Sequence, residues 1–317
     1  MGTTSDLSEA FLNAVEQAAI ACGHWKGKGD KNAADQAAVE AMRRCFDEVP
    51  FDGRVAIGEG ERDEAPMLYI GEPLGSMVGM PHATQIDIAV DPLECTNNCA
   101  YDKPNAIAVL AAGPRGTLLH APDCYMDKIA AGKDLEAHLS LEGDVAYNLE
   151  QIAHVHDKPM SEVKVVSLDR TRHDDLFRTI REVGADLHLL GDGDVSGAIW
   201  AAKDDGPFDV LLGIGAAPEG VISATAIRGL GGIFEGRLVF RNDEEEARAV
   251  DMVGDDLTRI WSAKDLCQST NSIFAAAGVC DGYLPGVEFS KDSAKTTSEI
   301  IDVETGHVHQ RQRTHSL

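Results

Sequence analysis

Strand patterns and helix patterns alternate along the chain beyond residue 160, and this alternation limits the fold more than any other feature. Short apolar runs bounded by glycine or charged residues predict strands, and the amphipathic segments between them predict helices. Repeated strand–helix units predict a mostly parallel sheet covered by helices, the α/β class. The expected strands are 163–168, 186–190 and 209–214, and the expected helices are 173–183, 194–202 and 218–230.

Loops at the ends of these strands are the expected binding sites, because ligands of such sheets bind beyond the carboxyl ends of the strands. Arg170 and Arg172 place two cations in the first loop, which suits an anionic ligand, although exposed arginines in ion pairs would give the same pattern. Pro218 stands where a dinucleotide-binding motif requires glycine, so a dehydrogenase is disfavoured. The loops span 169–173, 191–194 and 213–220.

The N-terminal half contains a strand pattern that ends in acidic residues. Residues 86–90 predict a strand, and Asp91-Pro92 is expected to stop it because proline lacks a backbone donor. Asp91 and Glu94 lie three positions apart at this end, and the hydroxyl of Thr96 follows them. Carboxylates and a hydroxyl are hard oxygen ligands of the kind that Mg²⁺ prefers. This stretch therefore predicts a magnesium-type site.

Two further acidic features precede that strand. A short strand over 54–57 leads into the loop 58–64, whose four carboxylates repel one another unless solvent or cations neutralise them. Glycines in this loop allow a tight turn, so a metal-binding loop and a solvated acidic turn both fit. Asp35 is expected in the first turn of a helix over 34–45, where a carboxylate favours the helix dipole without any metal.

The rest of the chain predicts further helices and hairpins. An amphipathic pattern predicts a helix over 5–22, and hairpins are expected at 106–120 and 296–313. The change of pattern near residue 160 divides the chain into an N-terminal α+β half, 1–160, and a C-terminal α/β half, 161–317.

Charge and hydropathy exclude several classes of partner. The chain has 53 acidic and 28 basic residues, a formal charge of −25, which disfavours nucleic acid and anionic membranes as partners. It has no apolar run long enough to span a bilayer and no secretory signal pattern at its start, so a cytoplasmic or plastid-stromal location is expected. Its seven cysteines form no C-x-x-C pair, which disfavours a structural zinc site.

Four motifs resemble a known family. The segments are Gly58–Glu72, Asp87–Glu94, Gly191–Val195 and Gly213–Ser223. They resemble the class II fructose-1,6-bisphosphatases of the GlpX type. The residues of these motifs are similar to those of the cyanobacterial branch, which acts on both fructose 1,6-bisphosphate and sedoheptulose 1,7-bisphosphate. The similarity extends over nearly the whole chain.

The resemblance implies a fold, a reaction and a cofactor. The implied fold is the layered lithium-sensitive sugar-phosphatase fold, which is inositol-monophosphatase-like. The implied reaction removes the 1-phosphate of fructose 1,6-bisphosphate to give fructose 6-phosphate, with sedoheptulose 1,7-bisphosphate as a second substrate, and it requires Mg²⁺ or Mn²⁺. Such an enzyme would serve gluconeogenesis or the Calvin cycle and would form a homodimer or homotetramer.

The resemblance also implies roles for individual residues. Thr96, with Asp63, would orient or activate the attacking water. The implied metal ligands are Asp35, Glu59, Asp91, Glu94 and Glu219. The implied substrate contacts are Glu94, Cys95, Thr96, Tyr125, Arg170, Thr171, Arg172, Asp192, Gly193, Asp194 and Ala216.

Cys95 departs from the family, which usually has glycine after the glutamate. If the glycine conformation is kept, a residue with a side chain costs about 1–2 kcal/mol. Cys95 and Cys99 also lie four positions apart, beside the expected site. This spacing allows the two thiols to be sensitive to oxidation, and inert thiols are the alternative. An inositol-phosphate phosphatase or another sugar phosphatase of the same fold would also fit the motifs, as would a non-catalytic homologue that binds sugar phosphates.

Overall fold

The computed structural model describes residues 3–60 and 67–317, which form two compact units. The first unit contains the residues up to Leu119 together with Ser269–Leu317, and the second contains His120–Gln268. The boundary that the sequence suggested, at residue 160, falls inside the second unit. It differs because Ser269–Leu317 return to the first sheet, where β11 pairs with β4.

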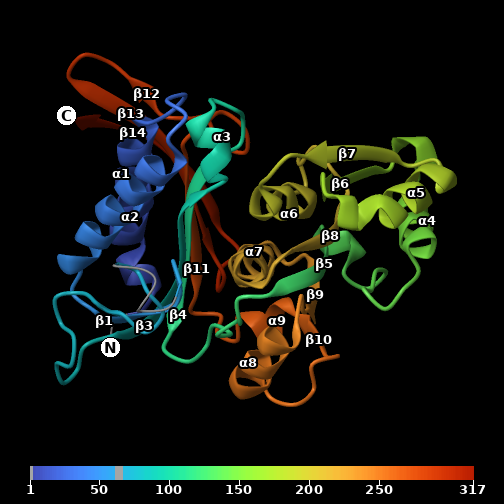
Figure 1. Ribbon diagram of the computed structural model, residues 1–317, viewed down its shortest axis with the longest axis horizontal. Helices are drawn as coiled ribbons and strands as arrows, with labels where there is room; N and C mark the ends of the chain where they lie inside the picture. The colour runs from blue at the N-terminus through green and yellow to red at the C-terminus, as the bar shows by residue number, and fades with distance from the viewer. Residues whose placement is uncertain (1–2, 61–66) are drawn as a thin grey trace. The chain divides into compact units, whose positions relative to one another are not determined.

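The first unit is built on a mixed sheet with strand order β12-β13-β11-β4-β3-β1-β2, and β14 pairs with β13 (Figure 1). The helices α1 and α2 pack together and against this sheet (Figure 1). The strands are β1 (Asp52–Ile57), β2 (Pro73–Leu74), β3 (Gln85–Glu94), β4 (Ile107–Pro114), β11 (Ile273–Gly278), β12 (Glu288–Phe289), β13 (Ser293–Asp302) and β14 (Val308–Ser316). The helices are α1 (Ser8–Gly23), α2 (Lys31–Asp47) and α3 (Thr96–Ala100), and a 3₁₀ turn, Ser5–Leu7, precedes α1.

One face of this sheet packs into an apolar core. Ile86, Ile88 and Val90 alternate along β3 and contact the buried residues of the two helices. Phe11 of α1 makes edge-to-face contacts with Phe46 of α2 and with Phe51, at ring-centroid distances of 6.4 and 6.0 Å. These contacts fix both helices over the strands that carry the candidate ligands.

Two expectations for this unit are wrong. Asp91-Pro92 does not end the strand, because β3 continues to Glu94 through an irregularity in its pairing with β4. Proline is tolerated at such a bulge, where no ladder donor is required. The hairpin expected at 106–120 does not form, since β4 pairs with β3 and β11 and no strand follows within 117–120. The predicted hairpin at 296–313 is confirmed as β13 and β14.

The second unit is built on a sheet with strand order β10-β9-β5-β8-β6-β7. Buried residues of α4 and α5 contact one face, and α6 and α7 pack on the other. The strands are β5 (Tyr125–Ala131), β6 (Lys164–Leu168), β7 (Asp186–Leu190), β8 (Val210–Ala216), β9 (Ile233–Val239) and β10 (Ile260–Ser262). The helices are α4 (Val145–Val155), α5 (Asp174–Val183), α6 (Asp194–Ala202), α7 (Ala217–Leu230), α8 (Asp243–Val253) and α9 (Ala263–Leu266), with 3₁₀ turns Lys133–Leu135, Met160–Glu162 and Thr171–His173.

The expected mostly parallel sheet is correct only for part of this unit. β6 pairs in parallel with β7 and β8, so the loops after these three strands lie at one edge, as predicted. β5 pairs antiparallel with both β8 and β9, and β10 pairs antiparallel with β9. The α/β class is confirmed, with a mixed sheet in each unit. In the described part of the chain, every helix is too short or too polar to cross a lipid bilayer.

Candidate active site

The ends of β1 and β3 bring Glu59 and Asp91 to the same edge of the first sheet. These strands are parallel, and Ile57 of β1 lies opposite Ala89 of β3. Glu59 and Asp91 each follow that pair by two residues, and parallel strands end at a common edge. The register therefore supports the expectation that the acidic loop and the acidic strand end belong to one region.

Gly58 holds the loop that carries Glu59 against its neighbours. The backbone N–H of Glu59 donates to the carbonyl of Leu68 at 3.0 Å. A Cβ atom at position 58 would lie 1.9 Å from that carbonyl oxygen, so only glycine fits. The close approach of Gly58 to Leu68 fixes the position of Glu59, just beyond the end of β1. Asp63, which the resemblance placed near the water, lies outside the described residues.

A β-bulge places Asp91 and Glu94 on the same face of the sheet. Asp91 lies opposite Val109 and Glu94 opposite Ile107, so three steps along β3 match two steps along β4. Side chains alternate between faces along a regular strand, so residues three apart would otherwise face opposite ways. Leu93, like Val90, belongs to the helix-side core, which confirms the change of phase. The Leu93 N–H donates to Asp91 Oδ1 at 3.1 Å and so ties the bulge to the carboxylate.

Cys95 ends the strand in a left-handed conformation, with φ +70° and ψ +50°. This confirms that the backbone conformation expected for glycine is kept by a residue that has a side chain. Cys95 is buried, and its carbonyl accepts the first backbone hydrogen bonds of α3. The hydroxyl of Thr96, the first residue of α3, donates to the carbonyl of Leu93 at 3.1 Å. The oxygen of Thr96 thereby keeps its lone pairs for a further donor.

Asp35 does not lie in the first turn of its helix, as the sequence suggested. α2 begins at Lys31, and the N-cap is Asp30, whose side chain accepts from the N–H of Ala33 at 3.0 Å. Asp35 lies in the second turn, so stabilisation of the helix N-terminus does not explain it. Burial raises the pKa of Asp35, which is the environment of a carboxylate that gains from a bound cation. α2 packs against β3 and α3.

These carboxylates do not form a closed ligand set by themselves. Within residues 3–60 and 67–317, no three His, Cys, Asp or Glu side chains are grouped closely enough to hold a metal ion. Asp35, Glu59, Asp91 and Glu94 still supply the hard oxygen donors that Mg²⁺ and Mn²⁺ prefer. The donor chemistry therefore fits such an ion.

In the second unit, three of the implied substrate contacts lie together. Tyr125, at the start of β5, pairs with Ala216, at the end of β8. The guanidinium of Arg172 lies over the Tyr125 ring, 4.6 Å from its centroid. Arg172 also donates from Nε and Nη2 to the carbonyl of Ile214, at 3.1 and 2.6 Å. An aromatic ring and a cation thus adjoin the end of β8.

Arg170 has a different role from Arg172. Its Nη1 donates to the carbonyls of Asp169 and Gly191, at 2.9 and 2.7 Å. Its Nη2 lies 3.4 Å from Oδ1 of Asp192, whose pKa is raised chiefly by burial. Arg170 therefore joins the loops after β6 and β7. Thr171, between the arginines, is exposed.

Asp194 is buried against a lysine that sequence reasoning missed. Nζ of Lys128, in β5, lies 2.6 Å from Oδ2 of Asp194, and Lys128 is 1% exposed. Gly193, with φ +99°, turns the chain into α6. A Cβ atom on Gly215 would lie 1.8 Å from Oδ2 of Asp194, so glycine is required there. Lys128 alternates with Met126 and Ala130, and this pattern would have indicated burial had β5 been recognised.

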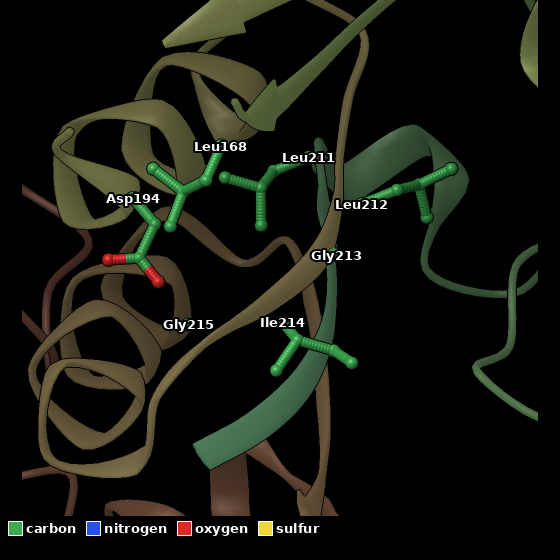
Figure 2. Close-up of a pocket in the computed structure, with 7 residues that line it drawn as sticks. All are labelled: Leu168, Asp194, Leu211, Leu212, Gly213, Ile214 and Gly215. Carbon is green, nitrogen blue, oxygen red and sulfur yellow. The ribbon is translucent and has the colours of Figure 1, made fainter. Parts of the chain in front are cut away.

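The Asp194 side chain borders a small cavity. Figure 2 shows the side chain beside a cavity of about 10 Å³, room for about one water molecule. The cavity is lined by Leu168, Asp194, Leu211, Leu212, Gly213, Ile214 and Gly215. This setting weakens solvent screening of the Lys128–Asp194 pair.

Glu219, in the first turn of α7, carries a buried oxygen that lacks a protein partner. Its Oε2 atom has no hydrogen-bond donor among the described residues. The pKa of Glu219 is raised to about 7, chiefly by burial and also by the nearby Asp194, while the charge of Lys128 acts in the opposite direction. A buried carboxylate oxygen without a donor suits a metal ligand. Glu219 thus fits the role that the resemblance implies.

His173, which the sequence did not single out, locks the ends of β6 and β8 together. Its Nδ1 donates to the carbonyl of Leu168 at 2.8 Å, and its Nε2 accepts from the N–H of Ile214 at 2.7 Å. This pair of bonds requires the neutral ring. Burial lowers the pKa of His173, and the charge of Arg172 acts in the same direction. His173 thereby positions Ile214, whose carbonyl holds Arg172.

We expect Cys95→Gly to be more stable than Cys95→Ala by about 1 kcal/mol. Both variants lose the buried sulfur, but only glycine relieves the left-handed strain at φ +70°. Urea unfolding of the two variants measures the difference. A more stable alanine variant would show that the strain is absent.

We expect Lys128→Met to lower the free energy of unfolding by about 3 kcal/mol, because Asp194 stays buried without its cation. The double variant Lys128→Met/Asp194→Asn should lose less than the two single variants together. Denaturant unfolding of the four proteins gives the coupling. Strictly additive losses would contradict a paired interaction.

We expect stability to depend on pH through His173. As pH falls through the ordinary pKa of 6.5, the unfolded chain binds a proton that the folded protein resists, so stability falls below that pH. The wild type should lose more stability between about pH 7 and 5 than His173→Gln, which lacks this group. Urea unfolding at both pH values tests this, and equal losses would count against it.

Comparison with known proteins places the chain in a family. The family described as bacterial fructose-1,6-bisphosphatase, glpX-encoded, matches residues 5–315. A protein of Thermosynechococcus vestitus named D-fructose 1,6-bisphosphatase class 2/sedoheptulose 1,7-bisphosphatase is 44% identical over 93% of this chain and 91% of its own length. A protein of the same name from Trichodesmium erythraeum is 43% identical, over 92% and 90%.

Among solved structures, the extragenic suppressor protein SuhB from Bartonella henselae aligns with a TM-score of 0.37 and 12% identity, over 63% of this chain and 75% of its own. A likeness of this size supports no conclusion about activity. The family match covers nearly the whole chain, and the two relatives share one name and align over at least 90% of both chains. The chain therefore belongs to the glpX-encoded bacterial fructose-1,6-bisphosphatase family.

Proposed function

We propose that this chain removes the 1-phosphate of fructose 1,6-bisphosphate and acts in the same way on sedoheptulose 1,7-bisphosphate. The observation that carries the proposal is the β-bulge that turns Asp91 and Glu94 to one face, directly before the hydroxyl of Thr96. The names of the relatives, which describe both bisphosphatase activities, agree with this chemistry.

The proposed cofactor is Mg²⁺ or Mn²⁺. A bound divalent cation would neutralise charge on the transferring phosphoryl group and lower the pKa of the attacking water. In the first unit, the proposed ligands are Asp35, Glu59, Asp91 and Glu94. In the second unit, the proposed ligand is Glu219, on the strength of its buried oxygen.

Residues of the chain supply the remaining functions in this proposal. The oxygen of Thr96, whose proton is donated to the carbonyl of Leu93, would accept a hydrogen bond from the attacking water and orient it. Asp194, fixed through Oδ2 by Lys128, would present Oδ1 to a sugar hydroxyl. Arg172 and Tyr125 would contact the phosphate that is not hydrolysed.

Several expectations stay predictions. These are the choice between Mg²⁺ and Mn²⁺, assembly as a homodimer or homotetramer, a cytoplasmic location, and a place in gluconeogenesis or the Calvin cycle. Phosphate release measured with each bisphosphate and each metal would rank the substrates and the ions.

We expect Asp91→Asn to lower kcat on fructose 1,6-bisphosphate by about 100-fold or more, because the charge on the carboxylate is lost. The asparagine side chain can still accept from the N–H of Leu93, so the bulge should persist. Excess EDTA should abolish wild-type activity, and added Mg²⁺ or Mn²⁺ should restore it.

Asp175→Asn serves as the matched control, because Asp175 has a highly exposed side chain in α5. It undergoes the same chemical change, and its activity should equal that of the wild type. Full wild-type turnover in excess EDTA, or an active Asp91→Asn enzyme, would overturn the proposal.

A further inference from the structure

Two arginines, not one, contact the ring of Tyr125. The guanidinium of Arg172 lies 4.6 Å from the ring centroid, and that of Arg241 lies 5.1 Å from it. Arg241 follows β9, whose last residue, Val239, pairs with Tyr125. Neither the sequence motifs nor the family resemblance pointed to Arg241. Both arginines are exposed, so both guanidiniums are accessible to a ligand.

Arg241 is held in place by a buried carboxylate. Glu245 is 3% exposed, forms an ion pair with Nε of Arg241, and accepts from the N–H of Arg241 at 2.9 Å. Asn242, the N-cap of α8, fixes Glu245 in turn by accepting its N–H at 2.9 Å. The start of α8 therefore anchors the arginine through its Nε and its backbone.

The terminal nitrogens of both guanidiniums retain donor capacity. Among the described residues, Nη1 and Nη2 of Arg241 and Nη1 of Arg172 have no acceptor within hydrogen-bond distance. Arg170 differs, because its Nη1 and Nη2 donate to the loops after β6 and β7. Arg241, rather than Arg170, thus has donors available for a ligand.

We propose that Arg241 acts with Arg172 as the pair that binds the phosphate that is not hydrolysed, which makes Arg241 a specificity-determining residue. This inference rests on the proposed function. Guanidinium groups match phosphate oxygens in geometry and charge. The chain carries a formal charge of −25, which repels a dianionic phosphate. Cations close to the phosphate are therefore required to overcome this repulsion.

The competing explanation is that Arg241 only packs on Tyr125 and stabilises the start of α8. In that case, its loss would lower stability and affect every substrate equally. A role in phosphate binding instead affects only substrates that carry the distal phosphate. Fructose 1,6-bisphosphate and fructose 1-phosphate differ in that group alone, so the ratio of their kcat/KM values separates the two explanations.

We expect Arg241→Met to lower kcat/KM for fructose 1,6-bisphosphate about 10-fold or more, mainly by raising KM. Its kcat/KM for fructose 1-phosphate should stay within about 2-fold of the wild type. Arg241→Lys keeps the charge and a donor to Glu245 but loses the planar guanidinium. Its kcat/KM for fructose 1,6-bisphosphate should therefore lie between those of the wild type and Arg241→Met. The lysine variant also serves if the methionine variant does not fold.

Arg237→Met is the matched control, because Arg237 lies on the adjoining strand β9 and its closest acidic partner is Asp127, at 3.7 Å. It removes the same charge and should leave the ratio of the two kcat/KM values unchanged. Calorimetric binding of fructose 6-phosphate in EDTA adds a readout without metal or turnover. Arg241→Met should weaken it about 10-fold, and Arg237→Met should not.

An unchanged ratio for the Arg241 variants, or an equal loss on both substrates, overturns the inference. The failure of the proposed function has a different signature, in which the wild type releases no phosphate from either sugar bisphosphate with any divalent metal. An active wild type with an unaltered ratio in Arg241→Met would remove the inference alone.

Discussion

The β-bulge in β3 is the constraint on which the candidate site of the first unit depends. Without the extra residue between Asp91 and Glu94, one carboxylate would point into the core beneath α1 and α2. A carboxylate among those apolar side chains would be costly, and the change of phase keeps both carboxylates off the core face of the strand. The left-handed Cys95 then ends the strand and begins α3 at Thr96. Strand irregularity and local strain are therefore concentrated where the chemistry is proposed.

The second unit solves a similar problem with a cation. Asp194 is buried, and Lys128 from the neighbouring strand supplies the opposite charge at 2.6 Å. Gly215 leaves the space that this contact requires, since any side chain would occupy the position of the carboxylate. Glu219 is close enough for its pKa to respond to both charges. Gly215, at the glycine-rich end of β8, is thus explained by charge packing, without any nucleotide.

Local patterns predicted the elements that local contacts determine. β6, β7 and β8, with the helices between them, were predicted because each strand is a short apolar run. β5 was missed because Asp127 and Lys128 interrupt its apolar pattern, and only the antiparallel neighbours β8 and β9 make it a strand. The false hairpin at 106–120 has the same origin, because β4 pairs with β11, more than 150 residues away. Long-range pairing cannot be inferred from one segment alone.

Residue type alone also could not rank the arginines. Arg170 and Arg172 lie two positions apart in the sequence, and residue type alone predicts equal attraction for an anion. In the structure, however, their N–H groups donate to different partners. Arg170 donates from both Nη groups to neighbouring loops, whereas Arg172 lies on Tyr125 with one Nη group uncommitted. The sequence did not single out Arg241, and only the pairing of β9 with β5 brings it to the same ring. An arginine can bind an anion only with those N–H donors that other residues of the protein do not occupy, and the fold determines which donors these are.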